Sequence, residues 1–377
     1  MSKRALILGK GASGRAAAKK LVAEGYEVDY AEDYSLVIAS PGLPVKSELQ
    51  YGVEHLRAKG TRLIAVTGSK GKSSVVKLIA EALNLTGVKA VPCGNYGLPV
   101  SEVDACDWAV VEVSSYQLET TNLPPDTFEA AVILNLQDDH LARHGSREVY
   151  HGLKRRLLTM AKAGFEAWKL EADDAIAGSY FDNPILRANA AGAVAVLRQV
   201  GVSPEVIRLA FRQFQPLPHR MSLVGTVKGM ACIDDSKATS LAALAAALQM
   251  TGSSVRLIAG GRAKGDDPKS IKEHLTKHAK KVYLIGECLK DFYAAWADVV
   301  PCEECGTLEH AVQRAFEEAE EGDKLLLSPG TASFDQFNSF EERGNVFTQL
   351  IYKEKGKRNE EVRFDNRCGG DCRFGGL

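Results

Sequence analysis

Residues 66–74, VTGSKGKSS, combine a lysine and two hydroxyl side chains with closely spaced glycines. They follow RLIAV, an apolar run of strand length, and precede VVKLIAEAL, whose apolar residues recur on one face of a helix. A strand, a glycine turn and a helix N-terminus together direct backbone N–H groups and the helix dipole at an anion. We therefore predict a phosphate-binding loop, in which Lys72 reaches the outer phosphates of a nucleotide and Ser73 is a ligand of Mg²⁺. The alternative is a polar turn that caps the next helix through Ser73, because Val66 replaces the first glycine of the strict pattern.

A second glycine motif lies at the start of the chain, at Gly9, Gly11 and Gly14. It follows a strand-like run and precedes an alanine-rich helical stretch, and the acidic pair Glu32 and Asp33 comes after the next strand-like run. This is the context of a dinucleotide-binding fingerprint. Two interpretations stay open: the motif binds NAD, or it binds another phosphorylated ligand while the second loop binds ATP.

Further polar residues follow apolar strands. Glu112 ends the run VVEV and could hold Mg²⁺ or cap a helix, and His140 lies in the polar stretch after the run AAVILNL. Three more stretches follow strands in the last third of the chain: DDSKATS, GGRAKGDD and SPGTASFDQF. Because the carboxyl ends of parallel strands meet at one edge of a sheet, we expect these three to share a cationic crevice that suits an anionic amino acid or a phosphate.

The alternation of strands and helices predicts an α/β protein of three domains. We expect a small Rossmann-like N-terminal domain at 1–60, a P-loop ATPase-like central domain at 61–217 and a Rossmann-like C-terminal domain at 218–354. The charged, glycine-rich residues 355–377 predict a flexible tail.

Composition argues against several classes of protein. The net charge is −1, which gives no reason to expect a nucleic acid or a membrane surface as partner. No apolar run reaches the roughly 18 residues of a membrane span. The eight cysteines are mostly isolated, as in a reducing cytoplasm, and a zinc site would require the pairs Cys302–Cys305 and Cys368–Cys372 to meet. We expect a cytoplasmic monomer.

Taken in order along the chain, these motifs resemble the Mur ligases, and among them the members that add D-glutamate. The resemblance is carried by VTGSKGKSS, GNYGLP, VEVSSYQLETT, LNLQDDHLARHG, LPHRM, DDSKATS, LIAGGRAKGDD and LSPGTASFDQFNSFEERGNVF. It implies an ATP-dependent enzyme of peptidoglycan precursor synthesis, which joins D-glutamate to UDP-N-acetylmuramoyl-L-alanine through an acyl phosphate.

The resemblance also implies a role for individual residues. Those implied in catalysis are Lys72, His140, Lys154 and Lys237. Those implied in ATP binding are Gly68, Ser69, Lys70, Gly71, Lys72, Ser73, Ser74, Asn189, Arg220 and Asp235. Those implied as ligands of two Mg²⁺ ions are Ser73, Glu112, His140 and Lys154, the last as a carbamate. Those implied in binding the UDP substrate are Gly9, Gly11, Ala12, Ser13, Ser40, Pro41, Gly42, Asn95 and Ser114. Those implied in binding D-glutamate are Thr239, Lys264, Ser333 and Phe340.

Some residues depart from what the resemblance implies. Lys154 lies in the basic helical stretch VYHGLKRR, which by itself predicts a solvated side chain. Lys70 stands where the family usually has Asn, and PILRAN replaces the family's His-Asn pair ahead of Asn189. Two other functions stay open. The first is an NAD-dependent oxidoreductase, which would not need the phosphate loop. The second is a different Mur-type ligase or a degenerate ATP-binding homologue.

Overall fold

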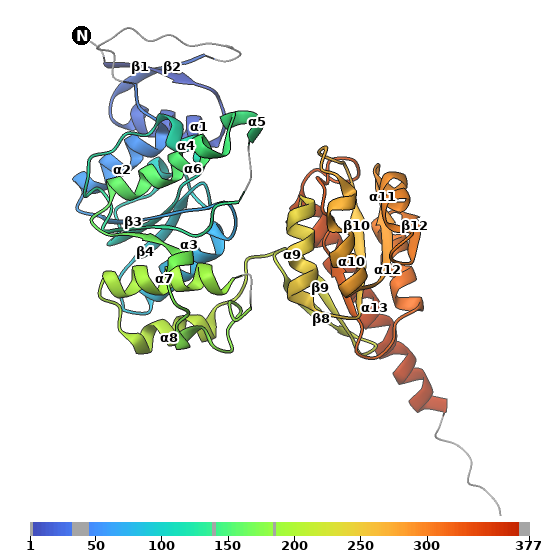
Figure 1. The fold of residues 1–377 in the computed structure, drawn as a ribbon. Helices are drawn as coiled ribbons and strands as arrows, with labels where there is room; N and C mark the ends of the chain where they lie inside the picture. The colour runs from blue at the N-terminus through green and yellow to red at the C-terminus, as the bar shows by residue number, and fades with distance from the viewer. Residues whose placement is uncertain (1–2, 32–44, 138–140, 184–185, 369–377) are drawn as a thin grey trace, which may run out of the picture. The chain divides into compact units, whose positions relative to one another are not determined.

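The computed structural model describes residues 3–31, 45–137, 141–183 and 186–368, with the side chains of 141–142 and 357–368 left out. The chain divides into two compact units, Met1–Gln215 and Pro216–Leu377 (Figure 1). Each unit has a mainly parallel sheet with helices on both faces, so the predicted α/β class is confirmed. The predicted domain boundaries stay predictions.

The larger sheet of the first unit has the strand order β4-β5-β3-β6-β7, and all its pairs are parallel. Side chains of β3 alternate between two apolar cores, with Ile64 and Val66 in one and Leu63 and Ala65 in the other. Such burial on both faces explains why β3 is an uninterrupted apolar run in the sequence. The strands are β3 (Arg62–Thr67), β4 (Ala90–Gly94), β5 (Trp108–Glu112), β6 (Ala130–Ile133) and β7 (Gly164–Glu166).

Helices cover both faces of this sheet (Figure 1). One face packs against α3 (Lys72–Asn84), α7 (Arg187–Gln199) and α8 (Pro204–Gln213). The other packs against α2 (Glu48–Ala58) and α4 (Ser115–Thr120), near α5 (Leu141–His144) and α6 (Arg147–Arg156). Short 3-10 turns cover Val100–Glu102, Leu157–Met160, Ala167–Lys169 and Asp174–Ile176. Residues 48–58 fall within the predicted first domain (1–60), yet the α2 side chains Leu49, Val53 and Leu56 lie in the core of the central sheet.

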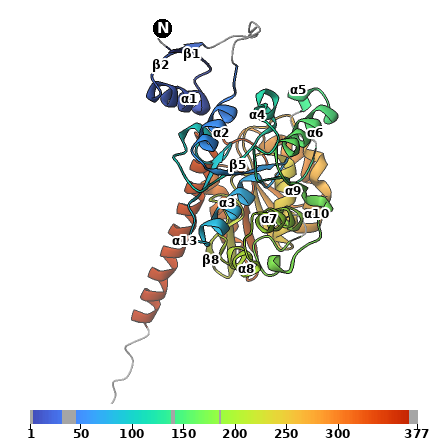
Figure 2. The same cartoon turned by 90° about the vertical axis from the view of Figure 1, so that its left-hand side faces the viewer.

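The N-terminal glycine motif forms a small parallel β-α-β unit: β1 (Lys3–Leu8), α1 (Ala12–Ala23) and β2 (Tyr26–Ala31) (Figure 2). Gly9 has a φ of +88°, and a Cβ on Gly14 would lie 2.1 Å from the Gly9 carbonyl oxygen. The motif therefore needs glycine at these positions, as the fingerprint predicts.

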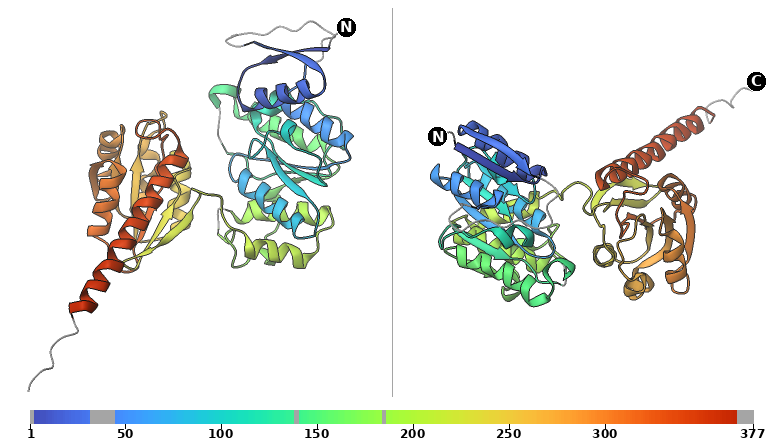
Figure 3. Two further views of the ribbon diagram at one scale, coloured as in Figure 1. Left: turned by 180° about the vertical axis from the view of Figure 1, so that it is seen from behind. Right: turned by 90° about the horizontal axis from the view of Figure 1, so that it is seen from above.

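The sheet of the second unit has the order β12-β11-β10-β13-β9-β8, with β8 antiparallel to β9 and the other pairs parallel. Its strands are β8 (Ser222–Val227), β9 (Met230–Asp234), β10 (Val255–Gly260), β11 (Ala279–Ile285), β12 (Cys302–Gly306) and β13 (Lys324–Leu327). One face packs against α9 (Leu241–Thr251), α10 (Lys272–His278) and α11 (Leu289–Trp296), and a 3-10 turn covers Pro268–Ile271. The other packs against α12 (Leu308–Glu317) and the first part of α13 (Phe340–Cys368), which crosses the sheet in Figure 3.

Helix α13 continues through much of the predicted tail, to Cys368. The second half of its sequence is rich in Glu, Lys and Arg, which are good helix formers, and this local preference explains why the backbone stays helical after the apolar contacts of Phe347 and Ile351 end. Residues 369–377 lie outside the described residues, and the flexibility of the tail stays a prediction.

Only the first of the two cysteine pairs has described side chains, so whether the pairs meet is not tested by the described residues. Cys302 and Cys305 lie on strand β12, where Cys302 Sγ donates to the Val300 carbonyl oxygen, and Cys372 lies outside the described part of the chain. No group of three His, Cys, Asp or Glu side chains that could hold a metal occurs in the described residues.

A network of ion pairs in the second unit should make its stability fall in acid. The hydrogen bond from Arg314 to Glu303 (2.6 Å), together with one from Lys281 (2.6 Å), lowers the pKa of Glu303. A lowered pKa in the folded state means that the stabilisation is complete above the unfolded-state value of about 4 and is lost as the pH falls through the folded value. We expect Glu303→Gln to reduce the free energy of unfolding at pH 7 by on the order of 1 kcal/mol.

Urea unfolding of wild type and Glu303→Gln between pH 7 and pH 3 measures this effect. The difference between the two proteins should shrink steadily below about pH 4. A difference that stays constant or grows on acidification would show that the Glu303 ion pairs do not stabilise the fold.

Candidate active site

The predicted strand, glycine turn and helix are confirmed at residues 66–74. Strand β3 ends at Thr67 and α3 begins at Lys72. Gly71 has a φ of +83°, and a Cβ there would lie 2.3 Å from the Asn189 Nδ2 atom, so this position requires glycine. Lys72 Nζ donates to the carbonyl oxygens of Gly68 (2.9 Å) and Ser69 (3.2 Å) and thus lies over the loop. Ser73 and Ser74 are buried in the first turn of α3. The backbone and the lysine have the arrangement that phosphate binding requires.

Asn135, which the sequence did not single out, holds the loop in place. Its Oδ1 accepts from the Lys70 backbone N–H (2.9 Å), and its Nδ2 donates to the Lys70 carbonyl oxygen (2.8 Å). The same Nδ2 donates to Asn189 Oδ1 (2.9 Å), and the Asn135 carbonyl oxygen accepts from the Ser69 N–H (3.1 Å). A polar residue two positions after the buried strand β6 was the only sequence signal for it. The amide fixes both backbone groups of Lys70.

Asn135→Asp should weaken nucleotide binding. The change keeps the size of the side chain and its acceptor oxygen, but it replaces the donor Nδ2 with a carboxylate oxygen. That oxygen would face the Lys70 carbonyl oxygen and Asn189 Oδ1 and would repel both. Losing two donated hydrogen bonds in this way should weaken ADP binding by about ten- to hundredfold. Calorimetric titration with ADP measures it, and Asn122→Asp, which adds the same charge at an exposed position of the same unit, is the control. Equal ADP affinity in wild type and Asn135→Asp would contradict the role of Asn135.

Lys154 is buried beside the phosphate loop, so the interpretation of it as a solvated helix residue is wrong. Its side chain is only 1% exposed, and its Nζ donates to the Gly68 carbonyl oxygen at 3.0 Å. Tyr150, one turn earlier on α6, lies 4.7 Å from this amine by its ring centroid and has its hydroxyl 3.0 Å from Ser69 Oγ. Helix α6 thus turns two residues of spacing i, i+4 toward the loop, although most of its residues are charged.

Glu112 has one carboxylate oxygen without a hydrogen-bond partner among the described residues. The residue is 3% exposed and ends strand β5, where it pairs in register with Val66 at the base of the loop. Its Oε1 accepts from Asn95 Nδ2 (2.9 Å), while Oε2 is buried and unpartnered. A buried carboxylate oxygen without a donor suits a cation. The alternative, a helix cap, is wrong because Ser114 caps α4 with a complete capping box.

The carboxylate of Glu112 and the hydroxyl of Ser73 are oxygen groups of the kind that Mg²⁺ prefers, so these residues fit the ion. The amine of Lys154 fits only after conversion to a carbamate. His140 lies outside the described residues.

The residues predicted to bind the UDP substrate are placed only in part. Gly9, Gly11, Ala12 and Ser13 form the turn between β1 and α1, whereas Ser40, Pro41 and Gly42 lie outside the described residues. Asn95 Nδ2 donates a hydrogen bond to Glu112 Oε1, and Ser114 Oγ accepts one from the Gln117 N–H (3.2 Å). Asn95 and Ser114 therefore have structural partners, and their contacts with a substrate stay predictions.

The predicted ATP contacts are divided between the two units. Asn189 is 4% exposed and faces the phosphate loop through Asn135 and Gly71. Arg220 and Asp235 belong to the second unit. Burial raises the pKa of Asp235 to about 7, although its carboxylate accepts from the Ser328 hydroxyl (2.9 Å) and the Met221 N–H (3.2 Å).

The predicted D-glutamate residues lie at one edge of the second sheet. Strands β9, β13 and β10 are neighbours and parallel, so the segments that follow them leave the sheet at the same edge. Lys237 and Thr239 follow β9, Lys264 follows β10, Ser333 follows β13, and Phe340 begins α13. Lys237 Nζ lies 3.7 Å from the centroid of the Phe340 ring. The shared edge is thus confirmed, and the crevice stays a prediction.

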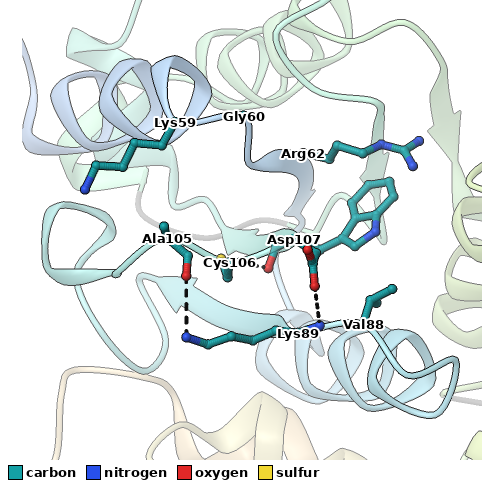
Figure 4. Close-up of a pocket in the computed structure, with 9 residues that line it drawn as sticks. Lys59, Gly60, Arg62, Val88, Lys89, Ala105, Cys106 and Asp107 are labelled. Carbon is teal, nitrogen blue, oxygen red and sulfur yellow. Dashed lines mark hydrogen bonds between the residues drawn. The ribbon is translucent and has the colours of Figure 1, made fainter.

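One cavity of the first unit, of about 550 Å³, lies away from these residues (Figure 4). It is lined by Lys59, Gly60, Arg62, Val88, Lys89, Ala105, Cys106, Asp107 and Trp108. Arg62 and Trp108 begin their strands, so the cavity lies at the amino ends of β3 and β5, opposite the end that the phosphate loop follows. In it the Lys89 N–H donates to Asp107 Oδ2 (2.7 Å), and the Arg62 guanidinium lies 3.9 Å from the Trp108 ring centroid.

Comparison with known proteins identifies the family of this chain. The model of the Mur ligase middle domain matches residues 66–185, and that of the Mur ligase glutamate ligase domain matches residues 219–330. A UDP-N-acetylmuramoylalanine–D-glutamate ligase of Chlamydia pneumoniae is 30% identical over 420 residues, which cover 95% of this chain and 100% of the relative. The chain belongs to the Mur ligase family. A relative of the same name from Methylobacillus flagellatus is 34% identical to this Mur ligase over 384 residues, covering 85% of the chain and 83% of the relative.

Solved structures share the fold of this Mur ligase. MurF from Thermotoga maritima, in complex with ADP, has a TM-score of 0.62 at 16% identity and covers 95% of this chain and 96% of its own. MurC from the same organism has a TM-score of 0.61 at 14% identity, with 94% and 100% covered. The predicted family and multidomain α/β architecture are confirmed. No helix among the described residues of this Mur ligase combines the length and the hydropathy that crossing a membrane requires.

Proposed function

We propose that this Mur ligase joins D-glutamate to UDP-N-acetylmuramoyl-L-alanine at the expense of ATP, in the synthesis of a peptidoglycan precursor. One structural observation supports the proposal independently of the names of the relatives. The amines of Lys72 and Lys154 both donate to the carbonyl oxygen of Gly68 in the phosphate loop. At the base of this loop lies the buried carboxylate of Glu112, one oxygen of which has no hydrogen-bond partner among the described residues. Such a loop suits a nucleoside triphosphate and its cation.

The reaction needs ATP because a carboxylate is a poor electrophile. The γ-phosphoryl group passes to the alanyl carboxylate: a bond from phosphorus to the carboxylate oxygen forms, the bond between the β- and γ-phosphates breaks, and ADP leaves. The amine of D-glutamate then attacks the carbonyl carbon of this acyl phosphate. The bond from carbon to the phosphate oxygen breaks, inorganic phosphate leaves, and the amine gives up a proton. The outcome is an amide.

The residues of the first unit would stabilise the negative charge on the phosphate oxygens during this transfer. Lys72 would swing from the Gly68 and Ser69 carbonyl oxygens to the outer phosphates, and the loop N–H groups would bind the remaining oxygens. Ser73, Glu112, His140 and Lys154 as a carbamate would hold Mg²⁺, which when bound neutralises phosphate charge. A carbamate forms when the Lys154 amine adds to CO₂ and loses a proton, and it turns a buried cation into an anionic ligand.

The remaining binding residues are assigned by the same proposal. The turn between β1 and α1 would bind the uridine diphosphate, with Asn95 and Ser114 nearer the sugar and alanine. In the second unit Arg220 and Asp235 would contact ATP, and D-glutamate would be bound by Thr239, Lys264, Ser333 and Phe340, with Lys237 adding positive charge beside Phe340. The cysteines with described placement are free thiols, as suits a cytoplasmic enzyme. We propose a monomer with small-molecule substrates and no nucleic-acid or membrane partner.

Release of inorganic phosphate tests the function. Purified protein with ATP, Mg²⁺ and UDP-N-acetylmuramoyl-L-alanine should release phosphate steadily on addition of D-glutamate, and only weakly with L-glutamate. Omission of the UDP substrate should stop the reaction. Equal rates with both enantiomers, or release without the UDP substrate, would disprove it. Titration with NADH, followed by fluorescence, tests the oxidoreductase alternative and should show no binding.

A further inference from the structure

A guanidinium group is buried behind the proposed amino-acid site. Arg343, in the first turn of α13, is 1% exposed. Its Nε donates to Ser236 Oγ (3.0 Å), and its Nη2 donates to the carbonyl oxygens of Ser236 (2.9 Å) and Thr331 (3.2 Å). Its Nη1 donates to the Ala332 carbonyl oxygen (3.4 Å). All four acceptors are neutral oxygens, so the positive charge is held by hydrogen bonds.

Arg343 stays charged despite this burial. Burial lowers its pKa to about 10, and the charges of Asp335 and Asp234 oppose that shift. A pKa near 10 leaves the guanidinium protonated at neutral pH. Burying a cation among neutral acceptors is costly compared with an apolar side chain of similar volume. Its presence therefore indicates a purpose other than stability alone.

The partners of Arg343 are the segments that bear the proposed D-glutamate contacts. Ser236 directly precedes Lys237, and its hydroxyl donates to the Phe340 carbonyl oxygen (2.8 Å). Thr331 and Ala332 directly precede Ser333. Three separate stretches of chain thus meet at one side chain.

The fourth segment, which bears Lys264, joins the same cluster through its backbone. Arg262 and Ala332 exchange two backbone hydrogen bonds, of 2.9 and 3.1 Å. A Cβ on Gly261 would lie 2.7 Å from Thr331 Oγ1 and 3.3 Å from Arg343 Nη1, so this loop lies directly against the guanidinium. Thr331 Oγ1 itself is buried without a hydrogen-bond partner among the described residues. The cluster is tight enough that a shift of one loop must move the others.

We propose that Arg343 is a positioning residue for the amino-acid substrate: it fixes the relative placement of the loops that carry Lys237, Thr239, Ser333 and Lys264 and the start of α13 at Phe340. The planar guanidinium is suited to this because its five donors point in fixed directions, whereas a lysine amine cannot reach three carbonyl oxygens and a hydroxyl together. The positive charge behind the loops also favours a ligand with two carboxylates. This inference rests on the proposed function.

Arg343→Lys and Ser236→Ala test the proposal through the separate KM values of the three substrates. Arg343→Lys should raise the KM for D-glutamate at least tenfold, and Ser236→Ala, which removes only the bridge between Arg343 and Phe340, about threefold. The KM values for ATP and the UDP substrate should stay within twofold of wild type. The acyl phosphate, trapped with hydroxylamine in the absence of D-glutamate, should form at the wild-type rate.

Arg256→Lys is the matched control, because Arg256 is also a buried arginine of the second unit. It lies at the amino end of β10, where its Nε donates to Asp323 Oδ2 (2.6 Å), opposite the edge that carries the loops. We expect a lower melting temperature and an unchanged KM for D-glutamate.

The outcomes separate the inference from the function on which it rests. If Arg343→Lys changes the KM for D-glutamate no more than Arg256→Lys does, or raises all three KM values equally, the positioning role is overturned while the ligase function stands. If Arg343→Lys does not fold, Ser236→Ala decides by the same criterion. If wild type shows no release of phosphate that depends on D-glutamate, the function fails, and the inference fails with it.

Discussion

Lys72→Ala should reduce the phosphate release that depends on both substrates by at least about a thousandfold. The amine of Lys72 is the group best placed to follow the γ-phosphoryl group, because it begins α3 and already lies within hydrogen-bond distance of two loop carbonyl oxygens. Transfer of a phosphoryl group offers a protein little covalent chemistry, so positioned positive charge supplies most of the rate. Steady-state phosphate release with saturating substrates measures the loss.

Lys89→Ala is the matched control for this experiment. Lys89 is an exposed lysine of the same unit, in the cavity of Figure 4 at the opposite end of the sheet, and its Nζ donates to the Ala105 carbonyl oxygen (3.4 Å). It should be as active as wild type. Turnover of Lys72→Ala near the wild-type rate would contradict the phosphate-loop role.

A purely structural role of Lys72 makes a different prediction. If the amine only ties the Gly68 and Ser69 carbonyl oxygens, its removal should lower the melting temperature and leave turnover per folded molecule unchanged. Thermal unfolding beside the kinetic assay therefore separates the two roles. We expect a shift of a few degrees at most, since hydrogen bonds of partly exposed groups contribute only about 1 kcal/mol each.

Local patterns in the sequence predicted the features that depend on short-range geometry. The phosphate loop follows from a strand, two glycines and a helix within some twenty residues, and the structure places each of them as expected. The shared edge of DDSKATS, GGRAKGDD and SPGTASFDQF follows from parallel strands, whose carboxyl ends must meet. Both predictions needed residue type and position but no knowledge of long-range packing.

Features that depend on contacts across the chain could not be predicted in this way. Lys154 is surrounded by charged residues in the sequence, and only its packing beside Gly68, 86 positions away, shows that it is buried. Asn135 and Arg343 likewise act through partners far along the chain: Arg343 lies 107 positions from Ser236. A lone polar residue in a sequence has no signal for such a partner. The role of Lys154 was implied by the family resemblance, and the role of Arg343 is indicated by the structure. Residue patterns alone indicate neither.

Lys154→Ala should lose activity by about a hundredfold or more, and a short-chain carboxylate such as formate or acetate should restore part of it. The carbamate would place one negative charge, shared by two oxygens, at the end of a buried side chain beside the phosphate loop. Removal of the side chain leaves a space next to Gly68 that a small carboxylate can enter, and its oxygens can replace those of the carbamate. The measurement is phosphate release at rising formate concentration, at constant ionic strength.

Lys154→Arg separates a carbamate from a simple cation at this position. A guanidinium keeps the positive charge and can still donate to the Gly68 carbonyl oxygen, but it does not form a carbamate and leaves no space for formate. If Lys154 acts as a carbamate, Lys154→Arg should be as inactive as Lys154→Ala and should not respond to formate. If Lys154 acts as an amine, Lys154→Arg should keep much of the wild-type activity and formate should rescue neither variant. The two roles place opposite charges at the end of this buried side chain, so they predict different activities for Lys154→Arg and different responses of Lys154→Ala to formate.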